Sequence, residues 1–412
     1  MCSNFENNEL FENAEVPQTG NQKNYSVCKK CDKSSFVLLQ KKDPFCKSCF
    51  YEYCRHKFRS TIGKSNLVPH KSNVLVAFSG GLSSSALTDL LIDSIQNPDS
   101  HKKLHLHPSF VFVNGCHLLC KERKDLSNVQ FNEIGRMFKT GFKCFVTSLE
   151  MCFQSDGTFY EQITSETQFP LTNNDCQQKW FDSFESLNSL TAKEEYIRRT
   201  RHLLIMEIAK REKCPFVFLG SSGSRLAVNL LTDISQGKGN QLQNEVGFCD
   251  DRHEVKCLKP MREFVKKEIL FWAKMRDVVY EEKRNLTTQL SKKATLSRLT
   301  ESFITGLEES FPATVYTIVR TGNKLKPLAN SSKTCSLCLS QVDEPKDNYS
   351  AIDALNDTLR LSRNSTNEDI NKFENLCYGC KTMIRDSNNS ANIIPELIRC
   401  KQREIIDDFL LK

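Results

Sequence analysis

Eight cysteines, arranged as four Cys-x-x-Cys pairs, are the residues with the clearest potential for chemistry. Two pairs are separated by 14 residues near the N-terminus and two by 38 residues near the C-terminus: Cys28, Cys31, Cys46 and Cys49, then Cys335, Cys338, Cys377 and Cys380. Such spacings place four thiolates around one tetrahedral ion, so the pattern predicts two structural Zn²⁺ sites. Buried free thiols are the alternative, and the polar insertion at 343–371 makes the C-terminal pattern less specific.

A glycine turn between an apolar run and a helix-period pattern is the second candidate site. It comprises Ser79, Gly80, Gly81, Ser83, Ser84 and Ser85. Glycines let a ligand approach the backbone, and the free N–H groups and dipole at a helix start attract negative charge. The turn therefore predicts a phosphate or pyrophosphate site, with an ordinary strand-to-helix turn as the alternative.

A basic segment follows the first four cysteines. Aromatic residues at 50, 53 and 58 share one face of the expected helix, and the cations beside them are Arg55, Lys57, Arg59 and Lys64. Such a helix either presents a solvated basic face or binds the phosphate backbone of a nucleic acid.

The composition is that of a soluble globular protein in a reducing compartment. The 412 residues include 19 cysteines and carry a net charge of +7. Neither a membrane-length apolar stretch nor a signal-peptide core is present, which predicts a cytoplasmic chain without membrane contact and favours metal binding over disulfides. Residues 1–24 contribute −3, from four glutamates and one lysine, so the remainder carries +10 and suits a polyanionic partner.

Apolar runs that alternate with helical patterns define the framework that must position these groups. Strands are expected at 74–78, 109–113, 144–147, 215–219 and 255–258, and helices at 84–95, 127–140, 176–188, 191–213, 223–235 and 263–275. A capping box from Thr191 to Glu194 would open the long helix. The alternation predicts an α/β fold with a doubly wound, mostly parallel sheet, whose ligands bind beyond the carboxyl ends of the strands.

The same patterns divide the chain into five expected regions. They are a disordered acidic tail (1–25), an N-terminal zinc ribbon with the basic helix (26–72), the α/β domain (73–310), a C-terminal four-cysteine module (325–385) and an amphipathic tail helix (386–412).

The glycine turn resembles the pyrophosphate loop of the N-type ATP pyrophosphatases, which reads Ser-Gly-Gly-x-Asp-Ser. Leu82 stands where the tRNA-thiolating members carry Lys, and Ser83 stands where the family carries Asp. Charged groups at such positions normally stabilise the transition state of phosphate chemistry. The resemblance therefore implies a degenerate loop, which holds ATP weakly or not at all and does not activate it.

The order of the modules is similar to that of the tRNA thiolation enzymes, and in particular of the second subunits of the eukaryotic cytoplasmic tRNA 2-thiolation complexes. The similarity covers about residues 26–385, and its separate blocks are Phe45–Phe50, His56–Arg59, Val76–Gly81, Leu219–Ala227, Gly247–His253 and Lys259–Arg262.

Two further chemical positions of the catalytic members are altered. The paired Arg198 and Arg199, which the resemblance groups with the tRNA-binding residues, lack the Cys-x-x-Cys that precedes them in catalytic members. The fourth strand is followed by Gly220-Ser221-Ser222 instead of Gly-His-Asn. The resemblance therefore implies a chain without an Fe–S cluster and without catalytic activity of its own.

What the resemblance implies is a scaffold. Such a chain would bind tRNA in a heterodimer with the catalytic thiolation subunit, which uses sulfur from a thiocarboxylated ubiquitin-like protein to modify the wobble uridine of lysine, glutamate and glutamine tRNAs. The alternative is an adenylating tRNA sulfurtransferase that uses other cysteines, such as Cys116 or Cys249.

Overall fold

The computed structural model describes most of the chain between residues 27 and 387. The described ranges are 27–96 without 41, 103–115, 141–154, 159–164, 173–281, 293–325, 334–342 and 376–387, with a few isolated positions between them. The acidic tail, the helix expected at 127–140, Cys116, the insertion at 343–371 and nearly all of the tail helix lie outside these ranges.

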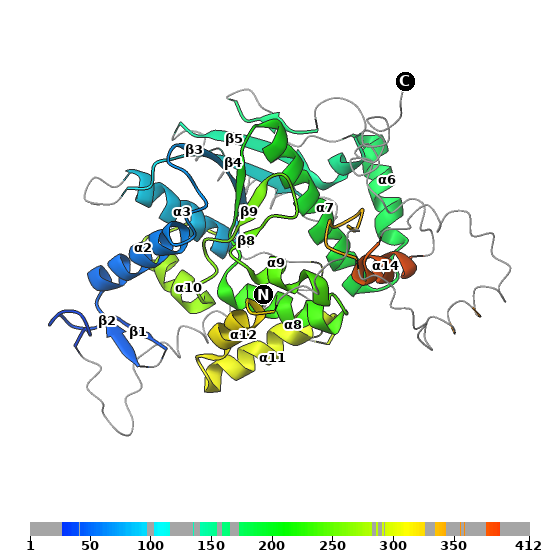
Figure 1. The fold of residues 1–412 in the computed structure, drawn as a ribbon. Helices are drawn as coiled ribbons and strands as arrows, with labels where there is room; N and C mark the ends of the chain where they lie inside the picture. Colours follow the sequence, from blue (N-terminus) through cyan, green and yellow to red (C-terminus); the bar gives the residue numbers. More distant parts are fainter. Residues whose placement is uncertain are drawn as a thin grey trace, which may run out of the picture.

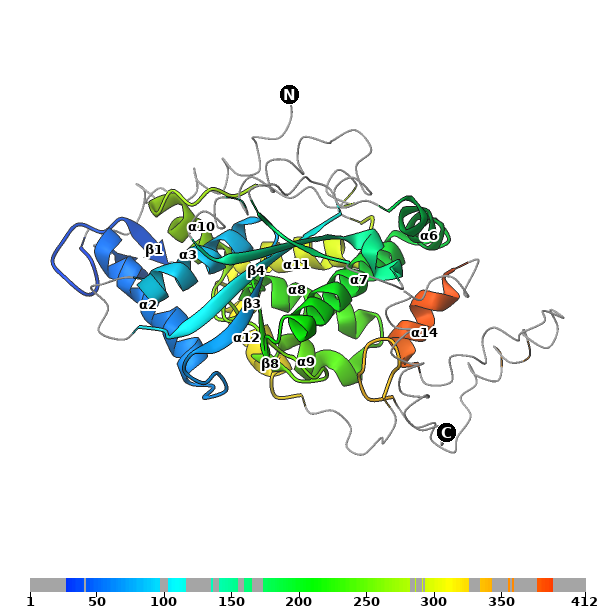
Figure 2. The same ribbon diagram turned by 90° about the horizontal axis from the view of Figure 1, so that it is seen from above.

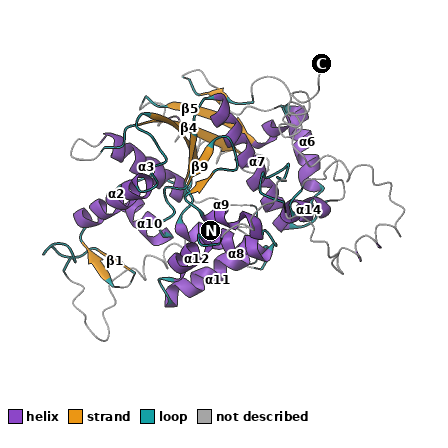
Figure 3. Cartoon of the chain, in the orientation of Figure 1, coloured by secondary structure: helices purple, strands orange, loops and turns teal. Residues whose placement is uncertain are grey.

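A seven-stranded sheet forms the centre of the molecule (Figures 1 and 3). Five parallel strands, β5 (Lys143–Ser148), β4 (Leu106–Asn114), β3 (Ser72–Phe78), β7 (Phe216–Leu219) and β9 (Lys256–Leu258), lie side by side in that order. Two short antiparallel strands, β6 (Glu161–Gln162) and β8 (Cys249–Asp250), close the edges. The doubly wound, mostly parallel sheet expected from the sequence is thus confirmed.

The two faces of the sheet bury different side chains because successive residues of a strand point to opposite sides. Leu75 of β3 and Val111 of β4 face one core, together with α6 (Asn174–Glu185), α7 (Leu190–Arg211) and the 3₁₀ turn η1 (Leu149–Phe153). The residues on either side of them face the other core, with α2 (Lys47–Gly63), α3 (Leu82–Gln96) and α10 (Lys266–Met275). Figure 2 shows the sheet between these layers.

A third cluster lies beside the sheet and includes one helix beyond the expected domain boundary at residue 310. The helices α8 (Gly223–Ser235), α9 (Leu242–Val246), α11 (Leu296–Ser310) and α12 (Thr314–Gly322) bury one another's apolar faces. The short turn η2 (Gly239–Gln241) leads into α9.

The two cysteine modules pack against this body and share its cores. The hairpin of β1 (Val37–Leu39) and β2 (Asp43–Phe45) and the buried face of α2, with Phe50 and Phe58, join the core that contains α3 and α10. The C-terminal module, with its helix α14 (Tyr378–Arg385), joins the core that contains α7. No helix of the described part is both long and apolar enough to cross a membrane.

The capping box expected at the start of the long helix is wrong. The helix begins at Leu190, and its N-cap is Ser189, whose hydroxyl accepts a hydrogen bond from the amide of Ala192 at 3.2 Å. Serine and threonine can both cap a helix through the side-chain oxygen, and serine is the more favourable of the two. The cap places Arg198 and Arg199 on the third turn of α7.

Candidate functional site

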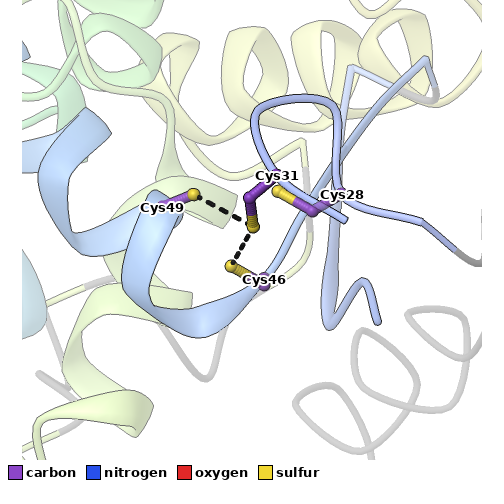
Figure 4. A group of neighbouring side chains, drawn as sticks. All are labelled: Cys28, Cys31, Cys46 and Cys49. Atoms are coloured by element: carbon purple, nitrogen blue, oxygen red, sulfur yellow. Dashed lines mark hydrogen bonds between the residues drawn. The ribbon is translucent and has the colours of Figure 1, made fainter. Parts of the chain in front are cut away.

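The N-terminal cysteines meet in one place, as the spacing predicts (Figure 4). Cys28 and Cys31 lie on the loop before the hairpin, Cys46 caps α2, and Cys49 is in its first turn. The Sγ atom of Cys31 is 3.5 Å from that of Cys46 and 3.6 Å from that of Cys49. A tetrahedron with Zn–S bonds of about 2.3 Å has edges of about 3.8 Å. The four thiols therefore have the spacing of a zinc site.

The C-terminal cysteines form a second cluster, which is more deeply buried. All four Sγ atoms lie within 4.8 Å of one another, and those of Cys338 and Cys377 are 3.5 Å apart. Cys377 caps α14 and accepts a hydrogen bond from the Nε2 atom of Gln241 at 3.1 Å. The four thiols perturb one another: the pKa of Cys377 is lowered to about 7 by the neighbouring Cys335, while the pKa values of Cys335 and Cys380 are raised.

A buried ionic network adjoins the second cluster and contains the paired arginines. Its members, which we call the central ionic network, are the cations Arg198, Arg199, Lys238 and Arg252 and the anions Glu195, Asp233, Glu245 and Asp250. Arg198 donates to Glu195 at 2.8 Å, and Arg199 donates to Glu195 at 2.7 Å and to the side chain of Gln241 at 2.9 Å. Burial opposes the ionisation of Glu245, but Arg198 and Arg252 hold its pKa well below the usual range.

The network connects α7, α8 and α9 to the C-terminal module. Gln241 contacts both Arg199 and the thiol of Cys377. Lys238 packs against Gly379 so closely that an added Cβ there would lie 2.6 Å from its Cγ atom. Both arginines are thus engaged inside the protein, and their contact with tRNA stays a prediction.

The glycine turn after β3 uses several of its own polar groups. The hydroxyl of Ser84 accepts from the amide of Ser79 at 3.2 Å and donates to the carbonyl of Gly81 at 2.9 Å. Gly80 has φ of 77°, and its carbonyl accepts from the amide of Glu281 at 2.9 Å. The segment at Glu281 therefore lies along the turn, and a Cβ on Gly220 would come within 3.0 Å of the Ser84 backbone.

The remaining turn residues differ in access. Ser83 is half-buried, whereas Ser85 is buried and its hydroxyl has no partner among the described residues. Gly81 and Leu82 lie at the start of α3, which begins two residues before the expected bound at 84. Neither Leu82 nor Ser83 supplies a charge to the turn, and the binding of an anion there stays a prediction.

Two of the four cations expected to bind nucleic acid have internal partners. Arg55 makes a two-pronged contact with Asp93, at 2.7 and 2.8 Å. The Nζ atom of Lys57 lies 2.8 Å from both carboxylate oxygens of Glu268 and 4.9 Å from the ring centroid of Phe264. These contacts hold α2 on α3 and α10.

Of the other two cations, Arg59 is half-buried like Arg55 and Lys57, and Lys64 is exposed. The Nε atom of Arg59 donates to the carbonyl of Arg55 at 3.3 Å, and Lys64 is exposed just beyond the helix end. A phosphate-binding role for the whole set stays a prediction.

Several groups of the site were not foreseen. Glu195 lies three and four residues before the paired arginines, and this helical spacing could have revealed the pairing. Asp233, Gln241 and Glu281 come from distant segments, and no local pattern connects them to the site.

Comparison with known proteins identifies close relatives in sequence. The sequence model of the family described as cytoplasmic tRNA 2-thiolation protein 2 matches residues 295–382. The protein of that name from Danio rerio is 32% identical, and the match covers 79% of this chain and 74% of that protein. The protein from Aedes aegypti is 30% identical, and the match covers 81% of this chain and 73% of that protein. The relative from Xenopus tropicalis is 29% identical, with 93% of this chain and 94% of that protein covered.

A solved structure shares the fold. The U34-tRNA thiolase NcsA of Methanococcus maripaludis, solved with its 4Fe–4S cluster, superposes with a TM-score of 0.55 and 17% identity. The match covers 77% of this chain and 94% of that protein. At this identity the similarity establishes the fold alone.

Proposed function

The chain belongs to the cytoplasmic tRNA 2-thiolation protein 2 family, and from that membership we propose that it is the non-catalytic, tRNA-binding subunit of its thiolation machinery. Family membership gives the process, the 2-thiolation of tRNA, and the compartment, the cytoplasm. The division of labour is our proposal: this chain supplies a scaffold, and a catalytic partner supplies the ATP chemistry and the sulfur transfer.

The state of the glycine turn is the observation that carries the proposal. Adenylation requires groups that meet the charge of the reacting phosphates. Here Leu82 and Ser83 supply none, and the Ser84 hydroxyl is bound within the turn. The main chain of Glu281 also lies along the turn. These features support a glycine turn that has a structural role and does not activate ATP.

The alternative, in which this chain is itself an adenylating tRNA sulfurtransferase, requires a reactive thiol near the turn. Of the two candidates, Cys116 lies outside the described residues. Cys249 is half-buried on β8, and burial raises its pKa, so less of the nucleophilic thiolate is available. This favours the scaffold over the alternative.

We further propose the cofactors and partners of this scaffold. Zn²⁺ fills both cysteine clusters, in which all eight ligands have matching spacing. No Fe–S cluster is expected, because Thr191 to Glu195 contain no cysteine ahead of the paired arginines. The partners are the catalytic subunit in a heterodimer, the wobble-uridine tRNAs for lysine, glutamate and glutamine, and the thiocarboxylated ubiquitin-like sulfur carrier.

Complementation in cells that lack this protein tests the proposal. Gly81→Ala adds a methyl group where a phosphate would approach the turn, and Gly81 does not have the positive φ of Gly80. We expect normal wobble thiolation with this variant, whereas the matched glycine substitution in the catalytic partner abolishes it. Loss of thiolation by a folded, partner-bound Gly81→Ala chain would show that the loop takes part in the chemistry.

A further inference from the structure

We propose that the outer face of the β1–β2 hairpin is a stacking site for an unpaired RNA base, with Phe36 as the platform and Lys47 as the adjoining cation. This inference rests on the proposed tRNA-binding function and gives it a location on the hairpin, beside the cations of α2.

Phe36 is exposed because successive side chains of the hairpin strand point to opposite faces. Val37, Leu39 and Phe45 point inward and are at most 6% exposed. Phe36 precedes the first of these residues, so it points to the opposite face, where its side chain is 54% exposed. A large aromatic ring in water is the group that stacks with a nucleobase at little conformational cost.

The ring is held in place on one side. The amide of Phe36 donates to the carbonyl of Phe45 at 2.8 Å, which fixes its backbone to the second strand. The Nζ atom of Lys47 lies 4.7 Å from the centroid of the Phe36 ring. Lys47 directly follows Cys46 at the start of α2, so the metal cluster positions the cation beside the ring. A cation next to an aromatic platform suits a nucleotide, which presents a base and a phosphate together.

The charge around the hairpin favours a polyanion over an apolar protein partner. Residues 27–49 contain six lysines and two aspartates, a balance of +4. A zinc ion with four thiolates contributes about −2, so the module stays cationic with its metal in place. Of these lysines, Lys30, Lys33 and Lys42 are exposed, and Lys29 pairs with Asp43.

The helix α2 offers fewer free cations than its sequence indicates. Arg55 and Lys57 bind Asp93 and Glu268, so their charges are already compensated within the protein. Around the hairpin Lys30, Lys33 and Lys42 are exposed, whereas Arg55 and Lys57 of α2 are half-buried.

The test measures RNA affinity with the full-length chain at fixed salt. The probes are a tRNA transcript and a fluorescent, unstructured oligouridine. Phe36→Ala and Phe36→Leu should weaken the binding of both probes about tenfold, as expected for one lost stacking contact. Phe36→Trp should retain the affinity, and zinc content confirms that each variant is folded. Phe303→Ala is the matched control, because Phe303 is 57% exposed on α11, and it should change nothing.

The salt dependence tests the role of Lys47. Lys47→Ala should reduce the slope of log affinity against log salt by about one, because one phosphate contact is lost. An unchanged slope would overturn the phosphate contact.

The other outcomes separate this site from the proposed function. If the wild-type chain binds tRNA and the Phe36 variants bind it equally well, the stacking site is wrong while the tRNA-binding role stands. Failure of the wild-type chain to bind either RNA would overturn both. Loss of the catalytic subunit with RNA affinity intact would identify the hairpin as a protein interface and overturn the stacking site.

Discussion

Lys57, which the sequence places among the cations of a basic helix, has a structural role in this fold. Its ammonium group forms an ion pair with the carboxylate of Glu268, whose side chain is 2% exposed. The same ammonium group makes cation–π contacts with the rings of Tyr53 and Phe264. Removing one member of such a pair is costly, because Glu268 would keep its bonds from Tyr53 and the Val265 amide but lose the one cation that pairs with it in the described part of the chain. The basic helix therefore contributes to the attachment of the ribbon, whatever it contributes to tRNA binding.

Replacing Lys57 with Ala should destabilise the protein, because Glu268 loses its buried partner. We expect the free energy of unfolding to fall by about 3 kcal/mol. Denaturant titration of the purified chain measures it, and Lys64→Ala, at the exposed end of the same segment, should change the stability by less than about 0.5 kcal/mol. A Lys57→Ala chain of normal stability with a reduced salt slope for tRNA binding would instead make Lys57 a phosphate contact.

At the scale of elements, the C-terminal cysteine module is joined to the α/β domain by polar contacts. Gln241, on the turn before α9, donates to the thiol of Cys377 and accepts from Arg199. Groups that hold metal ligands in place raise the affinity of the site for its ion. The turn that carries Gln241 thus supports a cysteine cluster whose members lie far along the chain.

Replacing Gln241 with Leu should weaken one zinc site selectively. We expect two zinc ions per wild-type chain, and a loss of about 10- to 100-fold in affinity at the C-terminal site only, because Cys377 loses its hydrogen bond. Competition with a chromophoric chelator measures both sites, and Gln243→Leu on α9 is the control. Equal zinc retention in the two variants would contradict the role of Gln241, and the absorption of an Fe–S cluster would contradict the choice of metal.

The elements were predictable where their pattern is local. The strand expected at 74–78 is present at Ser72–Phe78, and the helix expected at 223–235 has those bounds, because apolar runs and glycine turns are local signals. The cysteine clusters were equally predictable, since Cys-x-x-Cys spacing encodes half of each site. The start of α7 was not predicted correctly, because Thr191 and Glu194 match a capping box while Ser189 is the actual N-cap.

The environment of the sites could not be predicted from local patterns. The partners of the paired arginines include Asp233 and Glu245, which follow 34 or more residues later and meet α7 only through the packing of α8 and α9. Likewise, only the folded chain brings Glu281 to the glycine turn. The sequence thus identified these residues, but only the tertiary contacts identified their partners.

At the scale of the whole molecule, a thiolase-like fold retains its shape without its charged groups. The match to the NcsA structure covers 77% of this chain, while the glycine turn carries Leu82 and Ser83. Related folds can pair through equivalent faces, as identical subunits do. A retained shape with altered chemistry is what a heterodimeric scaffold requires.

The most direct test of this account is ATP- and tRNA-dependent release of pyrophosphate. The measurement uses this chain alone, the catalytic subunit alone, and the heterodimer with the glycine loop of either subunit substituted. We predict no release from this chain alone, normal release when Gly81→Ala is in this chain, and loss of release when the partner's loop is changed. Pyrophosphate release by this chain alone, abolished by Gly81→Ala, would contradict the account and make it an adenylating enzyme.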